Sequence, residues 1–191
     1  MEIVNIFAIV KNSLLAVQFD GKESDEFSML FNNWQDVEYL EQFFEDNKQD
    51  LQSGFYGNIT IEEAVFQTIE EAESMERYIK KVANRGNSDP NNTLHDLVFT
   101  PLHKNDNTIN HQESKAYGQN NHSWLRMYAI RISTNLYVVS GGAIKLTGKI
   151  QDRTHTTDEL LKLKVTAAYL KEIGLIKKED YGFIEISSHG K

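Results

Sequence analysis

Arg126 and Tyr128 are the residues whose types and spacing best suit chemistry on an anionic ligand. They lie two residues apart in the alternating segment 124–132, so a guanidinium and a phenol share one face of a predicted strand. A guanidinium binds phosphate through paired N–H donors, and a phenol can contact a base. Between Leu97 and Lys149 the chain carries six basic and two acidic residues, although its formal net charge is −8. This local inversion of charge predicts an anionic partner that is bound at one place.

The first half of the chain is acidic and differs in charge from the second. Residues 1–90 contain 18 acids and 7 bases, whereas residues 91–191 contain 10 acids and 13 bases. Two apolar runs, at 3–10 and 14–19, are separated by a short polar turn and predict a β-hairpin. We therefore expect the acidic half to begin with this hairpin.

Two amphipathic helices are expected after the hairpin. The first ends near Asn47, and its apolar positions recur at helical spacing: Trp34, Val37, Leu40 and Phe44. Thr60 and Glu63 form a capping-box pair that begins the second helix, which ends at Gly86. The acidic residues of this second helix could form a nucleic-acid mimic or a metal surface, but a solvated outer face is their usual explanation. They are Glu62, Glu63, Glu70, Glu71, Glu73 and Glu76.

A run of turn-forming residues at 86–93 predicts a boundary between an acidic segment, 1–90, and a basic segment, 91–191. A long polar loop is expected from His103 to His122. Three histidines in or beside this loop could act as a general acid or base, because an unperturbed imidazole titrates near about pH 6.5. They are His103, His111 and His122.

The basic segment is expected to hold an antiparallel strand pair, 124–132 with 136–140. The dipeptide Gly141-Gly142 predicts a bulge or a close backbone approach just after it. Thr156 with Glu159 is expected to cap a final helix. Arg131 lies on the strand face opposite Arg126 and is expected to extend from the strand end to solvent.

Composition removes several classes of protein. The chain has no cysteine, which excludes disulfides and thiolate zinc sites. Its N-terminus lacks the pattern of a signal peptide, and no stretch approaches the ~20 apolar residues of a membrane span, so we expect a cytoplasmic protein without a membrane partner. The six histidines do not show metal-ligand spacing, and we expect neither a metal site nor a cofactor.

Three stretches of the basic segment together resemble a known family. They are residues 115–118 (Lys-Ala-Tyr-Gly), residues 123–131, which contain Leu-Arg followed by an apolar strand, and residues 136–149, which end in the pair Lys145 and Lys149 before a helix. In this order they resemble the toxins of the RelE/HigB superfamily, in its HigB-like branch. The resemblance covers roughly residues 94–175.

The resemblance implies a RelE-like antiparallel sheet flanked by helices, and it has no counterpart for the first ninety residues. Together with the β-hairpin and helices expected there from the residue pattern, it gives an α+β fold. It also implies the toxin of a toxin–antitoxin pair, a metal-independent endoribonuclease that acts on mRNA on or off the ribosome. A small helix-turn-helix antitoxin is the implied protein partner, and a homo-oligomer is compatible with it. The expected catalytic residues are Arg126, Lys145 and Tyr128, and the expected substrate-binding residues are Lys115, Lys149, Arg131 and His103.

Two other interpretations remain open at this point. The basic face can belong to a non-enzymatic binding module of a mobile element, or the fold can be that of a ParE-like poison of DNA gyrase. Arg126 can simply occupy an exposed sheet face, and Lys145 and Lys149 can flank a turn. A shared fold does not separate these functions.

Overall fold

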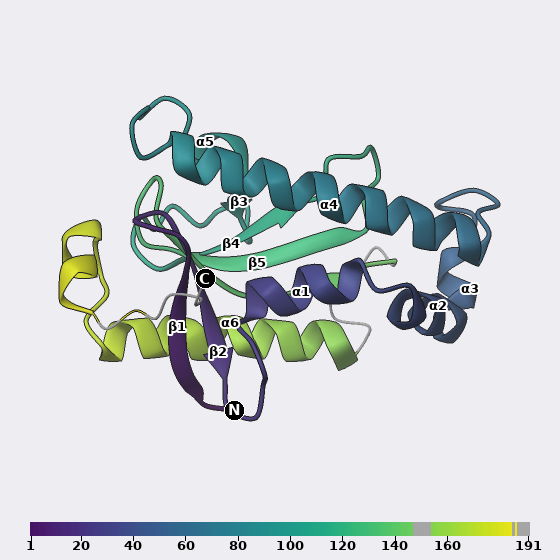
Figure 1. Ribbon diagram of the computed structural model, residues 1–191, viewed down its shortest axis with the longest axis horizontal. Coiled ribbons are helices and arrows are strands. Elements are labelled where there is room, and N and C mark those ends of the chain that lie inside the picture. Colours follow the sequence, from purple (N-terminus) through teal and green to yellow (C-terminus); the bar gives the residue numbers. More distant parts are fainter. Residues whose placement is uncertain (147–153, 185, 187–191) are drawn as a thin grey trace.

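The computed structural model describes residues 1–146, 154–184 and 186, without the side chains of 154–156 (Figure 1). Along this part of the chain, two strands are followed by five helices, four strands and a final helix with a short 3₁₀ helix. The strands are β1 (Ile3–Val10), β2 (Leu14–Phe19), β3 (Thr100–Pro101), β4 (Gln112–Tyr117), β5 (Leu125–Arg131) and β6 (Tyr137–Ile144). The helices are α1 (Glu26–Trp34), α2 (Val37–Asp46), α3 (Lys48–Leu51), α4 (Ile61–Arg85), α5 (Leu94–Leu97) and α6 (Thr154–Glu172), followed by the 3₁₀ helix η2 (Lys178–Phe183).

The six strands form one mixed sheet in the order β1-β2-β6-β5-β4-β3. The N-terminal hairpin has the predicted bounds, and β5 and β6 form the predicted antiparallel pair, which agrees with the α+β class. β4 and β3 extend this pair antiparallel and were not predicted as strands. The parallel pair β2–β6 joins the hairpin to the rest of the sheet and runs only from Leu14–Tyr137 to Ala16–Val139. Acidic and basic segments therefore share one sheet.

Helices cover both faces of this sheet (Figure 1): α1 and α4 lie on one face and α6 lies on the other. Alternate residues of β5 enter two separate cores. Leu125 and Met127 pack on the side of α1 and α4, whereas Tyr128 and Ile130 pack on the side of α6. Because helices cover both faces of the sheet, the strand face that Arg126 and Tyr128 share is largely buried. Only the end of β5 at Arg126 can contact a ligand.

Three local expectations differ from the structure. The helix expected over Trp34 to Asn47 is two helices, because Asp36 caps a new one by accepting a hydrogen bond from the Tyr39 amide at 2.7 Å. The final helix begins at Thr154, before the expected cap, and the Glu159 side chain is buried. The expected loop from His103 to His122 contains β4, whose buried positions are mostly polar or small and gave no apolar alternation.

The turn-rich segment 86–93 follows the capped helix α4, which ends at Arg85 before Gly86 as predicted. Asn135, in the turn between β5 and β6, is buried and ties the two ends of this segment together. Its side-chain amide donates to the Ala83 carbonyl at 3.0 Å, and its Oδ1 accepts from the Leu94 amide at 3.0 Å. Both ends of the segment are therefore hydrogen-bonded to the turn between β5 and β6.

The predicted bulge at the two glycines is confirmed. Tyr128 pairs with Gly141 and Ala129 pairs with Val139, so β6 carries one extra residue there. Gly141 has a φ of +153°, and a Cβ placed on it would strike the Glu159 carboxylate. This bulge brings the backbone of β6 against α6.

Gly142→Ala is expected to lower the free energy of unfolding by about 1–3 kcal/mol, as overpacking of a dense core does. The added Cβ would lie 2.5 Å from the Arg126 carbonyl oxygen and 2.9 Å from the Leu30 side chain. Urea denaturation measures the change. Gly182→Ala is the matched control, because a Cβ there meets nothing within 4 Å; equal losses in the two variants would contradict the close packing described here.

Candidate functional site

A pocket of about 420 Å³ lies where β5 begins and β6 ends. It brings together two of the predicted catalytic residues, Arg126 and Lys145, which are 19 positions apart in the sequence. The Lys145 amide donates to the Trp124 carbonyl at 2.7 Å, which holds the two strand ends side by side. We call this the Arg126 pocket; its lining is Asp50, Ser53, Phe55, Tyr56, His122, Ser123, Arg126, Lys145 and Leu146.

The Arg126 guanidinium is held in a fixed orientation. Its Nη1 donates to the carbonyls of Ser123 at 2.8 Å and Leu125 at 2.7 Å. Its central carbon lies 4.2 Å from the ring centroid of Tyr117, the residue that faces it on β4. Burial lowers the pKa of Arg126, but a guanidinium remains charged in proteins. A guanidinium has five N–H donors, so Arg126 retains others with which to bind an anion.

Lys145 adds a second cation to the same pocket. Burial is the main cause that lowers its pKa, and the charges of Arg126 and Lys115 lower it further. An ammonium group with a lowered pKa transfers a proton more readily near neutral pH. Arg126 and Lys145 can thus bind an anion together, and Lys145 is suited to proton transfer as well.

An aromatic wall faces these cations and comes from the acidic segment, between α3 and α4. The Tyr56 hydroxyl donates to the Lys145 carbonyl at 2.9 Å, and its ring lies 5.1 Å from Trp124. Phe55 is 66% exposed and packs edge-on against His122, with 5.6 Å between the ring centroids. An exposed aromatic ring beside two cations is a suitable surface for a nucleobase next to its phosphate.

Sequence reasoning missed this wall. Phe55 and Tyr56 stand between Gly54 and Gly57, and both glycines have positive φ values, +94° and +77°. The sequence signal was therefore an aromatic pair flanked by two turn-forming glycines. It lies about seventy residues before Arg126, and only the folded sheet joins them.

The other predicted site residues that the structure describes lie outside the pocket lining. Lys115 is near it: its ammonium lies 5.6 Å from the Tyr117 ring and donates to the Leu102 carbonyl at 3.3 Å. Tyr128 is 1% exposed in the core beside α6, where burial raises its pKa to about 12. No hydrogen-bond partner of its hydroxyl is found within the described part of the chain.

Two further predicted substrate contacts are distant from the Arg126 pocket, and one cannot be placed. Arg131 occupies the opposite end of β5 and is buried, so the prediction that it extends to solvent is wrong. His103 is exposed and lies 3.6 Å from a carboxylate oxygen of Glu113. Lys149 lies outside the described residues.

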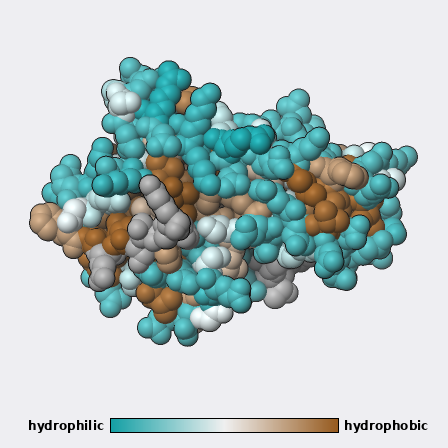
Figure 2. Space-filling model, in the orientation of Figure 1, coloured by the Kyte–Doolittle hydropathy of each residue, from teal (hydrophilic) through white to brown (hydrophobic). Residues whose placement is uncertain are grey.

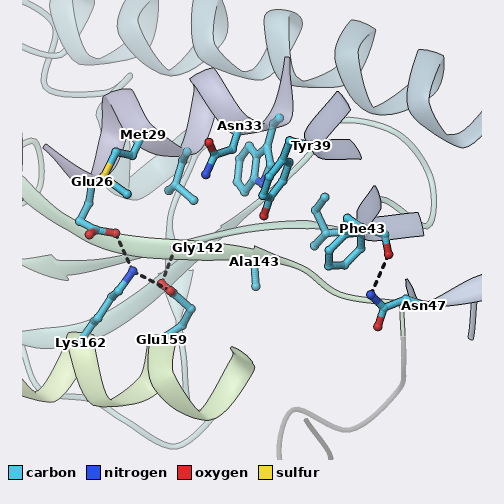
Figure 3. Close-up of a pocket in the computed structure, with 13 residues that line it drawn as sticks. Glu26, Met29, Asn33, Tyr39, Phe43, Asn47, Gly142, Ala143, Glu159 and Lys162 are labelled. Atoms are coloured by element: carbon cyan, nitrogen blue, oxygen red, sulfur yellow. Dashed lines mark hydrogen bonds and ion pairs between the residues drawn. The ribbon is translucent and has the colours of Figure 1, made fainter. Parts of the chain in front are cut away.

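Figure 3 shows a second pocket, of about 290 Å³, where α1 and α6 meet the end of β6. Lys162 lies between two carboxylates there, 2.8 Å from Glu26 and 2.8 Å from Glu159. Glu159 also accepts a hydrogen bond from the Gly142 amide at 2.8 Å. Because β6 no longer pairs with β2 at this point, α6 supplies the acceptor that a strand would otherwise provide.

We call these three side chains the Lys162 cluster. Burial is the main cause that raises the pKa of Glu26 and of Glu159, and Lys162 opposes the increase in both. The cluster joins α1, β6 and α6, and it carries one more acid than base. Because it joins three elements, we interpret the Lys162 cluster as a structural ion-pair network. Because it has two acids and one base, the pocket that it lines does not favour an anionic ligand.

Within the described ranges, no group of three or more histidine or carboxylate side chains is placed to hold a metal ion. The same part of the chain contains no helix long and apolar enough to cross a bilayer. The chain matches no model of a known protein family, no curated protein and no solved structure.

Proposed function

We propose that the protein is the toxin of a toxin–antitoxin pair and cleaves RNA at the Arg126 pocket. The observation that carries the proposal is the placement of Arg126 and Lys145 in one open pocket with the exposed ring of Phe55. Two cations suit a phosphodiester, and a ring suits an unstacked base. The resemblance of residues 94–175 to RelE/HigB toxins supports the same class of substrate.

The proposed chemistry is attack of the RNA 2′-hydroxyl on the adjacent phosphorus. His122 accepts the hydroxyl proton, the O2′–P bond forms, and the P–O5′ bond breaks as Lys145 protonates the departing oxygen. Arg126 binds the two non-bridging oxygens, where negative charge grows in the transition state. These roles need no metal ion. Tyr128 is buried behind this surface, and we assign it no proton transfer.

The partners in this proposal are single-stranded RNA, free or on the ribosome, and a small helix-turn-helix antitoxin. The net charge of −11 over residues 1–90 keeps nucleic acid away from most of the surface. RNA is therefore directed to the basic end of the sheet. A non-enzymatic binding module would use the same cations without turnover.

Induced expression of the chain without an antitoxin is expected to arrest bacterial growth, because cleaved transcripts cannot support translation. Growth curves and viable counts measure the effect against an empty vector. The variant carrying both Arg126→Ala and Lys145→Ala is expected to grow normally. If soluble, folded wild-type protein accumulates and growth equals that of the empty vector, the toxin proposal fails and the binding module is favoured.

A further inference from the structure

An exposed apolar groove of about 450 Å³ runs between α2 and α4 and shares no lining residue with the Arg126 pocket. Figure 2 shows brown, hydrophobic residues gathered where these two helices meet. Val37 is 49% exposed and Phe66 is 63% exposed, both large values for apolar side chains. Phe66 and Ile69 are three residues apart on α4 and therefore neighbours along the groove. We call this the α2/α4 groove.

The groove has an acidic rim formed by Glu41, Glu45 and Glu62. The charge extends beyond the rim: α2 and residues 61–76 of α4 together contain ten Asp and Glu residues and no Lys or Arg. Some of these acids have partners: Glu63 is used in the helix cap, Glu71 accepts from the Asn120 amide, and Glu73 and Glu76 pair with Arg77 and Lys80. The three rim acids are exposed, and one of them, Glu45, lies 3.5 Å from Lys48 at the start of α3. The surface therefore keeps an excess of negative charge. Such a surface repels nucleic acid and anionic membranes.

We infer that the α2/α4 groove binds a basic amphipathic helix of a partner protein. A groove between two helices accepts the apolar face of a third, through anchors spaced at i, i+3 or i+4, and i+7. Lys and Arg on the flanks of that helix would meet the acidic rim. A second copy of this chain fits poorly, because each copy would bring the same ten acids to the interface. This inference does not depend on RNA cleavage.

A synthetic peptide of about 18 residues, or five helical turns, is a suitable probe. Leucines at i, i+3 and i+7 would form one face, and lysines would fill the remaining positions. A scrambled peptide of the same composition removes the apolar face and keeps the charge. Fluorescence anisotropy at about 0.15 M salt, where surface charges are screened beyond ~8 Å, measures binding. We expect the ordered peptide to bind at least about tenfold more tightly than the scrambled one.

Phe66→Ser is expected to weaken binding of the ordered peptide at least about tenfold, because it removes the most exposed apolar anchor. Leu161→Ser is the matched control, since Leu161 is 49% exposed on α6. Glu41→Lys is expected to weaken binding as well, whereas Glu172→Lys, on the exposed surface of α6, is not. In the labelled protein, NMR amide shifts should change over residues 37–46 and 61–69.

Equal binding of the scrambled peptide, or equal affinity in Phe66→Ser and Leu161→Ser, would overturn the inference. Sedimentation of the wild type tests the other possible occupant of the groove, a second copy of this chain. A dimer that Phe66→Ser converts to monomer would assign the groove to self-association instead. Because the Arg126 pocket is unchanged in these variants, RNA cleavage should persist in all of them, so failure here is distinct from failure of the proposed function.

Discussion

Arg126→Ala is expected to slow RNA cleavage by about 10²–10³-fold, the usual loss when one preorganised donor to a transition-state oxyanion is removed. Lys145→Ala is expected to lose a similar factor, because it removes both a charge and the proposed proton donor. The guanidinium is already oriented by Ser123, Leu125 and Tyr117, so little reorganisation occurs when charge develops. Cleavage of a labelled transcript, alone and in a translating extract, measures the rates.

The controls separate lost chemistry from lost structure. Arg77→Ala and Lys81→Ala remove exposed cations from α4, and both variants should cut RNA at the wild-type rate. Arg126→Lys keeps the charge but loses the paired N–H donors of the guanidinium and its stacking on Tyr117. It should therefore retain only part of the wild-type cleavage rate. If wild type cuts RNA and Arg126→Ala cuts equally fast, cleavage takes place at another site.

Lys162→Met is expected to lower the free energy of unfolding at neutral pH by about 3–5 kcal/mol, the usual cost of removing one partner from a buried ion pair. Lys162 is 15% exposed and contacts Glu26 and Glu159, which are 2% and 12% exposed at the side chain. Its removal leaves two buried carboxylates without their shared cation. Denaturant titration measures the loss, and Lys164→Met, on the exposed face of α6, is expected to have little effect.

The loss of unfolding free energy in Lys162→Met is expected to be larger at neutral pH than at acidic pH. The pKa values of Glu26 and Glu159 are raised in the folded protein, so the native state binds their protons more tightly than the unfolded chain does. Their contribution to stability is therefore lost as pH rises from about 4.5 through the raised values. Without Lys162 the pKa values of both carboxyl groups rise further, so ionising them at neutral pH costs more stability. Lys162→Met should therefore be most destabilised near neutral pH and least below about pH 4. An equal cost at both pH values would contradict the proposed burial of two carboxylates.

Local patterns in the sequence predicted much of the fold. The hairpin, the capped helix α4 and the glycine bulge each depend on residues close together in the chain, and each is confirmed. The strand β4 was missed because Gln112 and Ser114 occupy buried positions that usually hold apolar residues. The parallel pair β2–β6 joins residues more than 120 positions apart, and no local pattern encodes such a contact.

The candidate site was predicted in part. Strand alternation and the resemblance to RelE/HigB toxins singled out Arg126, and the resemblance singled out Lys145; the sheet places both in one pocket. The same reasoning treated residues 1–90 as an extension, whereas Phe55 and Tyr56 of that segment form the aromatic wall. Alternation placed Tyr128 beside Arg126 correctly but did not reveal that α6 covers it, because a strand pattern does not show how far a covering helix extends.

The central claim is that the Arg126 pocket cleaves RNA, and mapping of RNA 5′ ends in induced cells tests it most directly. One culture expresses the wild type, another expresses Arg126→Ala, and DNA breaks are scored in both. The account predicts new 5′ ends in wild-type cells within one induction period, their loss in Arg126→Ala, and intact DNA. Growth arrest with unchanged RNA ends would contradict it, and DNA breaks with intact transcripts would assign the chain to the gyrase poisons instead.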